Sequence, residues 1–237
     1  MGTVYLIPSN LHEEGFHALP GYITTAIKDC RVFFVENERT TRRYFKQLWK
    51  TQREGESIVI DDYEWYTISE DPAIPAAFRK HLSAGTPVGI VSEAGCPGVA
   101  DPGQGLVAIA QEMNATVRPL VGPSSVLLAL MASGLNGQQF RFCGYLPVDA
   151  VQRQKAIREL ETESAKKKMT QVFIETPYRN NQLLESLVKH CHPGTKICIA
   201  ADLTGSKEWI KTKTARQWAS EKPELHKRPV IFLLFSG

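Results

Sequence analysis

The alternation of two kinds of stretch constrains the fold of this chain more than any other feature of its sequence. Short apolar runs rich in β-branched and aromatic residues alternate with longer, more polar runs almost from end to end, as strands alternate with helices. The expected strands cover residues 4–7, 31–36, 57–66, 88–91, 115–120, 140–145, 171–175, 196–201, 208–212 and 230–235. The expected helices cover residues 15–28, 41–49, 73–83, 102–114, 126–133, 150–167, 181–191 and 214–221. This order predicts an α/β fold with mostly parallel sheets covered on both faces.

The length of 237 residues suits one large or two modest α/β domains, each able to bury its own core. A polar stretch at residues 136–139 separates two halves whose strands and helices differ in length. We therefore expect an N-terminal α/β domain over residues 1–137 and a C-terminal α/β domain over residues 138–237.

Composition narrows the class of protein further. Apolar and charged residues make up 43% and 22% of the chain, as in ordinary water-soluble proteins. The apolar run at residues 230–235 is far shorter than the roughly 20 residues that span a bilayer, so we expect no membrane segment. The first residues lack the charged and apolar regions of a signal peptide. Five scattered cysteines without a C-x-x-C pair favour a reducing cytoplasm, and we expect no metal site.

Four loops that follow expected strands are rich in small, polar or cyclic residues. They cover residues 8–10, 92–103, 122–125 and 175–177. Ligands of open α/β sheets bind beyond the carboxyl ends of strands, so these loops predict a ligand cleft. The 92–103 loop is the richest, with three glycines, two prolines and the acids Glu93 and Asp101. We expect Asp101 to cap the following helix, with Pro102 as its first residue.

Several familiar sites are missing from the sequence. It contains no G-x-x-x-x-G-K-[ST] phosphate loop, no G-x-G-x-x-G after the first strand and no G-x-S-x-G nucleophile elbow. Cys96 has no neighbouring histidine that would activate it as a nucleophile. The residues themselves therefore predict a two-domain α/β protein with a cleft for a small molecule, and they leave its chemistry open.

Longer sequence matches point to a family. The stretch VSEAGCPGVADPGQGLV, followed by VRPLVGPSS and LMASGL, resembles the S-adenosylmethionine-dependent tetrapyrrole methylase superfamily. The stretches FFVENERTTRRYF, QVFIETPYR and IAADLT are similar to motifs of its branch of 16S ribosomal RNA 2'-O-ribose methyltransferases. The order and spacing of these matches agree over nearly the whole chain.

The resemblance implies two α/β domains with S-adenosylmethionine in the cleft between them, and a homodimer. It also implies which residues contact the methyl donor, carried over by motif position. These residues are Pro8, Ser9, Glu93, Ala94, Gly95, Cys96, Ser124, Ser125, Thr176 and Ala201.

Three stretches depart from the branch, and two of them are expected to face the methyl acceptor. The third is Ser92-Glu93-Ala94-Gly95-Cys96 in place of S-D-A-G-T, in a donor loop that keeps its glycines and prolines. The first loop, which includes Asn10, is shorter than the branch pattern by about three residues. The branch motif E-D-T-R reads Glu36-Asn37-Glu38-Arg39 here. A ribose hydroxyl is a poor nucleophile, so a base or a nearby cation would assist its attack. Glu36 is the candidate base, and Arg39 or Arg42 the candidate cation. The alternatives are a helix-capping or ion-pairing acid for Glu36 and an exposed helix face for the arginines.

Basic residues bunch in three places, and the first bunch is the best candidate for substrate binding. The bunches are residues 39–46, 166–168 and 207–216. They are either solvated faces or phosphate contacts, and we assign Arg42 and Arg43 to the RNA or ribosomal subunit that would be the partner. Three hypotheses follow: an RNA methyltransferase, a methyltransferase of a small molecule such as a tetrapyrrole, or a non-catalytic nucleotide- or RNA-binding protein on the same fold.

Overall fold

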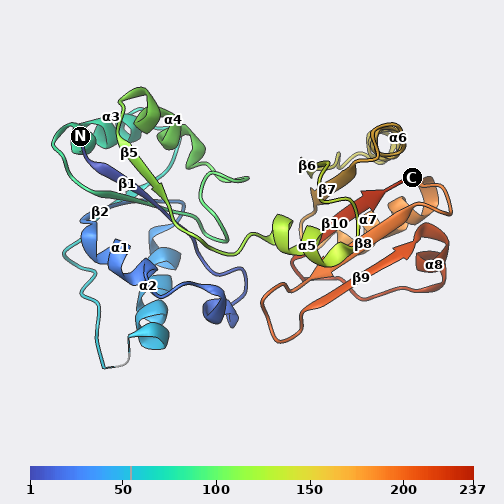
Figure 1. The fold of residues 1–237 in the computed structure, drawn as a ribbon, viewed down its shortest axis with the longest axis horizontal. Helices are drawn as coiled ribbons and strands as arrows, with labels where there is room; N and C mark the ends of the chain where they lie inside the picture. Colours follow the sequence, from blue (N-terminus) through green and yellow to red (C-terminus); the bar gives the residue numbers. More distant parts are fainter. Residues whose placement is uncertain (54) are drawn as a thin grey trace. The chain divides into compact units, whose positions relative to one another are not determined.

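The chain folds as two α/β units, seen in a computed structural model that describes residues 1–53 and 55–237. The units are Met1–Ser124 and Ser125–Gly237 (Figure 1). The expected boundary at residues 137 and 138 differs from this division. Helix α5 (Ser125–Ser133) accounts for the difference, because it packs on strands of the second unit.

The first unit is built on a five-stranded, fully parallel sheet in the order β3-β2-β4-β1-β5. Its strands are β1 (Thr3–Ile7), β2 (Val32–Val35), β3 (Glu64–Thr67), β4 (Val88–Val91) and β5 (Thr116–Pro119). Its helices are the 3-10 turn η1 (Gly15–Ala18), α1 (Ile23–Asp29), α2 (Glu38–Gln52), α3 (Ala73–Ser83) and α4 (Gln104–Glu112). Every residue of β2 and β4 is buried, as expected for β-branched and aromatic strands covered on both faces.

Two apolar layers sandwich this sheet. One contains Phe33 with Phe45 and Leu48 of α2 and Ile27 of α1. The other face contacts α3 and α4, including Phe78, whose ring meets Phe34 edge-on at a centroid distance of 5.1 Å. The parallel sheet predicted for the N-terminal half is therefore confirmed.

The strand order places a topological switch point between β2 and β4. From β2 the chain moves outward to the edge strand β3, whereas from β4 it crosses to β5 at the opposite edge. Loops that leave neighbouring strands in opposite directions open a crevice at the carboxyl end of the sheet, where open α/β sheets bind ligands.

The second unit has a mixed sheet in the order β6-β7-β10-β8-β9. Its strands are β6 (Phe140–Tyr145), β7 (Thr170–Ile174), β8 (Lys196–Ala201), β9 (Trp209–Thr214) and β10 (Val230–Phe235). Its helices are α5, α6 (Ala150–Lys167), α7 (Asn180–His190) and α8 (Ala215–Ser220).

The prediction of a mostly parallel sheet is wrong for this unit. Only β6 and β7 pair in parallel, while β10 runs antiparallel to β7 and β8, and β9 antiparallel to β8. Residues 202–208 join β8 to β9, and so short a connection fits a hairpin better than a helical crossover. Alternation of strands and helices does not reveal such reversals, because it carries no information on strand direction.

Element boundaries agree closely with the sequence prediction, with three informative exceptions. The expected helix over residues 15–28 is interrupted at Pro20, which separates η1 from α1. The expected extended run over residues 57–66 becomes a strand only at Glu64. Helix α4 begins at Gln104, so Asp101 does not cap it directly. Asp101 Oδ1 instead accepts hydrogen bonds from the amides of Gly98 (3.2 Å) and Gly103 (2.6 Å) and holds the loop.

Candidate functional site

The loops after β1 and β4 are joined by backbone pairing. Ser9 and Gly95 form an isolated antiparallel bridge, with N–O distances of 2.9 and 3.1 Å. The hydroxyl of Ser9 donates to the carbonyl of Ser92 (2.6 Å), and that of Ser92 donates to the carbonyl of Gly95 (2.8 Å). Since both serines are buried, their hydroxyls fix the shape of the 92–95 turn.

A third loop, after β5, packs against the first two. The Cys96 sulfur lies 3.7 Å from the Gly122 carbonyl and 3.6 Å from that of Pro123. Gly122 approaches Pro8 so closely that an added Cβ would lie 2.2 Å from the Pro8 Cβ. Gly95 has φ +74°, and an added Cβ would lie 3.2 Å from Leu11 Cδ2. The close approach of Pro8 therefore requires glycine at Gly122, and the positive φ requires it at Gly95.

The switch-point crevice is spanned by hydrogen bonds between the β2 and β4 loops. The amide of Glu93 donates to Glu36 Oε1 (2.8 Å), and the hydroxyl of Thr40 donates to Glu93 Oε1 (2.8 Å). Thr40 lies in the first turn of α2, which is capped by the side chain of Asn37. Glu36, Thr40 and Glu93 therefore form one polar cluster at the carboxyl end of the sheet.

Glu36 has a perturbed acidity. Burial raises the pKa of its carboxyl, and the nearby carboxylates of Asp101 and Glu93 raise it further because they oppose a second negative charge. The Glu93 amide acts in the other direction by donating to the ionised form. A carboxylate whose pKa is raised toward neutrality is suited to accepting a proton from a substrate.

A hollow of about 570 Å³ opens beside this polar cluster. Its walls come from the β1 loop, from α2 and from the β4 loop, with the lining residues Asn10, Glu13, Phe16, Thr40, Arg43, Tyr44, Gln47 and Glu93. The hydroxyl of Tyr44 donates to the buried carbonyl of Pro8 (2.7 Å), which ties α2 to the β1 loop. The volume lies within the range of ligand pockets, so the hollow can hold a group the size of a nucleotide.

The predicted cations lie on the outer side of α2. Arg39, Arg42 and Arg43 line a groove of about 680 Å³ together with lysines of the same helix. Arg42 bonds to Glu38 (2.7 Å) and Asp61 (2.5 Å), and its guanidinium lies 5.5 Å from the Trp65 ring centre. Arg42 is therefore neutralised locally, unlike what we expected of a substrate-binding residue.

The predicted residues of the second unit lie at one edge of its own sheet. Ile174 and Ala201, at the carboxyl ends of β7 and β8, pair with Ile231 and Val230 on β10. Thr176 is half-buried, and its amide donates to Glu175 Oε1 (2.7 Å). Ala201 is fully buried.

Unsatisfied polar atoms collect at this second edge. The Glu175 side chain has no exposed surface, and its Oε1 accepts from Arg179 Nη2 (2.7 Å). Glu175 Oε2, Asn180 Oδ1 and Thr204 Oγ1 are buried without a hydrogen-bond partner in the described part of the chain. Buried polar atoms normally have partners, so this edge has capacity for a polar ligand or for bound water.

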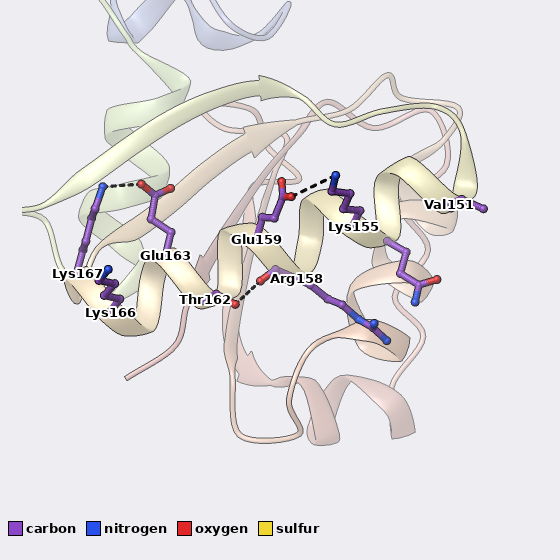
Figure 2. Close-up of a pocket in the computed structure, with 9 residues that line it drawn as sticks. Val151, Lys155, Arg158, Glu159, Thr162, Glu163, Lys166 and Lys167 are labelled. Carbon is purple, nitrogen blue, oxygen red and sulfur yellow. Dashed lines mark hydrogen bonds and ion pairs between the residues drawn. The ribbon is translucent and has the colours of Figure 1, made fainter.

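Other features of the described chain do not form a comparable site. A depression of about 740 Å³ is lined by α6 residues alone, and Figure 2 shows Lys155 paired with Glu159 and Lys167 with Glu163 along that helix. Within residues 1–53 and 55–237, no group of three histidine, cysteine or acidic side chains could hold a metal ion. No helix in these ranges is both long enough and apolar enough to cross a membrane.

The described cysteines are all free thiols. Burial raises the pKa of Cys30 and Cys191 to about 12 and that of Cys198 to about 11. Burial also raises the pKa of Cys96, which disfavours its thiolate form. Thiols held in the protonated form are poor nucleophiles, in agreement with the prediction that Cys96 is not a nucleophile.

The first unit brings most of its predicted site residues together. Pro8, Ser9, Glu93 and Cys96 share one group of bonded loops, and Glu36 joins them through Glu93. Sequence reasoning missed the α2 residues that face the hollow, which are Thr40, Tyr44 and Gln47. Their spacing of four and three residues on one helix face was the available signal.

Comparisons with known proteins agree with this fold. The pattern of the tetrapyrrole (corrin/porphyrin) methylases matches residues 24–219. A ribosomal RNA small subunit methyltransferase I from Micromonospora olivasterospora is 34% identical over 186 residues, which cover 78% of this chain and 55% of that protein. The chain thus spans about half the length of this curated relative.

Two solved structures share the fold at low sequence identity. The methyltransferase CobJ superposes with a TM-score of 0.62 at 17% identity, covering 100% of this chain and 95% of its own. Uroporphyrin-III C-methyl transferase from Thermus thermophilus, solved with S-adenosylhomocysteine, gives a TM-score of 0.58 at 16% identity, with coverage of 99% and 98%. Because the family pattern covers most of the chain, this protein belongs to the tetrapyrrole (corrin/porphyrin) methylase family.

Proposed function

We propose that the chain is an S-adenosylmethionine-dependent methyltransferase that acts on a ribose 2'-hydroxyl of ribosomal RNA. The observation that carries the proposal is the polar cluster of Glu36, Thr40 and Glu93, which lies at the switch point beside a hollow of about 570 Å³. The name of the M. olivasterospora relative, a ribosomal RNA small subunit methyltransferase, supports RNA as the acceptor.

The residues at the carboxyl end of the first sheet fit a methyl donor. The turn at Gly95 has a positive φ of +74° that disfavours a side chain, and Glu93 and Ala94 beside it are exposed. A ligand can therefore approach backbone atoms there, and the Glu93 carboxylate can accept hydrogen bonds from donor hydroxyls. Pro8, Ser9, Cys96, Ser124 and Ser125 would complete this wall. Within the second unit, the family resemblance also assigns Thr176 and Ala201 as donor-contacting residues, and Thr176 follows Glu175, whose Oε2 is unpaired.

When bound, S-adenosylmethionine supplies an electrophilic methyl group on a sulfonium that is its own leaving group. The protein has to align the two reactants and exclude water, and buried loops fixed by backbone pairing are suited to that task. Glu36 would take the proton of the ribose hydroxyl as the new oxygen–carbon bond forms and the carbon–sulfur bond breaks. Arg39 would polarise the hydroxyl or hold an adjacent phosphate. Asn10 and Arg43 would contact the acceptor nucleotide.

Calorimetry with S-adenosylmethionine tests the first half of the proposal. No heat of binding at a donor concentration of about 1 mM, far above common cofactor affinities, would contradict both enzyme hypotheses and favour a non-catalytic binding protein. Labelled donor incubated with ribosomal subunits, and separately with a tetrapyrrole, tests the second half. Label in the RNA supports the proposal, whereas label only in the tetrapyrrole overturns the RNA acceptor.

We also propose that the protein works in the cytoplasm and as a homodimer. The free cysteines support a reducing compartment, and the resemblance to the family supports the dimer. Light scattering on the purified chain gives the mass directly, and a monomer at all concentrations would contradict the second statement.

A further inference from the structure

Four cations form one stripe on the exposed face of α2. Arg39, Arg43, Lys46 and Lys50 follow one another at spacings of four, three and four residues, which places them on one side of the helix. All four are exposed, while the opposite face buries Phe45, Leu48 and Trp49 in the apolar layer. The stripe extends over about 17 Å at the rise of an α-helix.

Within residues 1–53 and 55–237, no acidic side chain neutralises the charges of this stripe. None of the four side chains forms an ion pair or hydrogen bond with another residue in the described ranges. Arg42, one position away, is the contrast, because Glu38 and Asp61 both bond to it. Positive side chains without acidic partners remain available for phosphates, whereas Arg42 serves to fix the wall of the groove.

The stripe continues into the hollow of the proposed active site. Arg43 and Gln47 line both the hollow beside Glu93 and the outer groove that holds Arg39, Lys46 and Lys50. A chain that enters one space can therefore pass into the other along α2. We propose that single-stranded RNA runs along α2, with its target nucleotide in the hollow and its flanking phosphates on Arg39, Arg43, Lys46 and Lys50. This assignment rests on the proposed function of the site.

The lining of the hollow favours an unpaired nucleotide over a duplex. Phe16 is half-exposed in its wall and stacks on Tyr44, with a ring-centre distance of 6.0 Å and an interplanar angle of 28°. Unstacked bases of single-stranded RNA bind to such aromatic faces, whereas bases inside a helix cannot reach them. Thr40 lies across the same space, where its hydroxyl can bond to the ribose of the nucleotide.

The test measures the salt dependence of RNA binding by the full chain. The probe is a labelled single-stranded RNA of about 12 nucleotides, within the usual site size of single-strand binders. Each phosphate contact to a single strand contributes about 0.7 to the slope of log affinity against log salt. The variant Lys46→Gln/Lys50→Gln removes two contacts, so the slope should fall by about 1.4 with the affinity for S-adenosylmethionine unchanged.

The matched control is Lys166→Gln/Lys189→Gln, which makes the same change of charge on exposed residues of α6 and α7. It should leave the slope as in the unaltered protein. The α2 path is wrong if both variants change the slope equally or if neither changes it. The proposed function still stands in either case, provided that the unaltered protein methylates RNA. If the unaltered protein neither binds nor methylates RNA, the proposed function fails as well.

Discussion

Replacing Gly122 by alanine should separate two loops of the proposed donor site. An added Cβ would lie 2.2 Å from the Cβ and 2.4 Å from the Cγ of Pro8. Ordinary carbon contacts begin at about 3.5 Å, so one loop has to move by about 1.3 Å. The Pro8 ring is rigid, and its carbonyl is held by Tyr44, so the shift falls on the 121–123 loop. Overpacking of this kind costs about 1–3 kcal/mol.

Two measurements check the Gly122→Ala variant. Denaturant unfolding should show that the first unit loses about 1–3 kcal/mol of stability. The fluorescence of Trp49 and Trp65, which lie in this unit, can follow its unfolding. Calorimetry should show a donor affinity about tenfold weaker for every 1.4 kcal/mol lost in binding. Gly21→Ala is the control, because no atom lies within 4 Å of its added Cβ. Unchanged stability and donor affinity in Gly122→Ala would refute the reasoning.

Three further predictions concern acidity, a buried ion pair and the core. The pKa of Glu36 is raised in the folded state, so ionising this carboxyl costs more in the folded than in the unfolded chain. The unaltered protein should therefore lose stability relative to Glu36→Gln as the pH rises above the ordinary pKa of glutamate. Parallel curves of stability against pH would contradict this. Arg179→Met leaves Glu175 without its main partner and should cost about 1.5–3 kcal/mol in thermal or denaturant unfolding, with partial recovery when Glu175→Gln is added. Phe78→Ala empties a fully buried position and should cost about 3–5 kcal/mol, and a smaller loss would mean that the core collapses around it.

Local sequence determined most of the elements but not the directions of all strands. The bounds of β4 and β10 follow from compact β-branched and apolar runs, and α6 from its long polar pattern and the cap at Asp149. The antiparallel course of β9 and β10 depends on which strands they meet. The partners of β10 are distant in the chain, so the pattern of apolar residues does not encode them, whereas for β9 the short connection over residues 202–208 was an available signal.

The candidate site was predictable in its loops but not in its side-chain pairings. Glycine and proline marked the 92–103 loop, and the positive φ angles of Gly95 and Gly98 explain the glycines at those two positions. The bonds from Glu36 and Thr40 to Glu93 join residues more than fifty positions apart, and no local pattern signals them. The same holds for Arg42, whose neutralisation by Asp61 appears only once the chain is folded.

The position of β10 has a consequence for synthesis on the ribosome. This strand lies between β7 and β8 in the sheet, yet it follows both of them in the chain. Until Val230–Phe235 has emerged, β7 and β8 each present an apolar edge with unpaired backbone groups. Such edges readily pair with other chains. The first unit can complete its sheet while the second is still being translated, so the interval before β10 arrives is the period in which nascent chains are most exposed to aggregation and most dependent on chaperones.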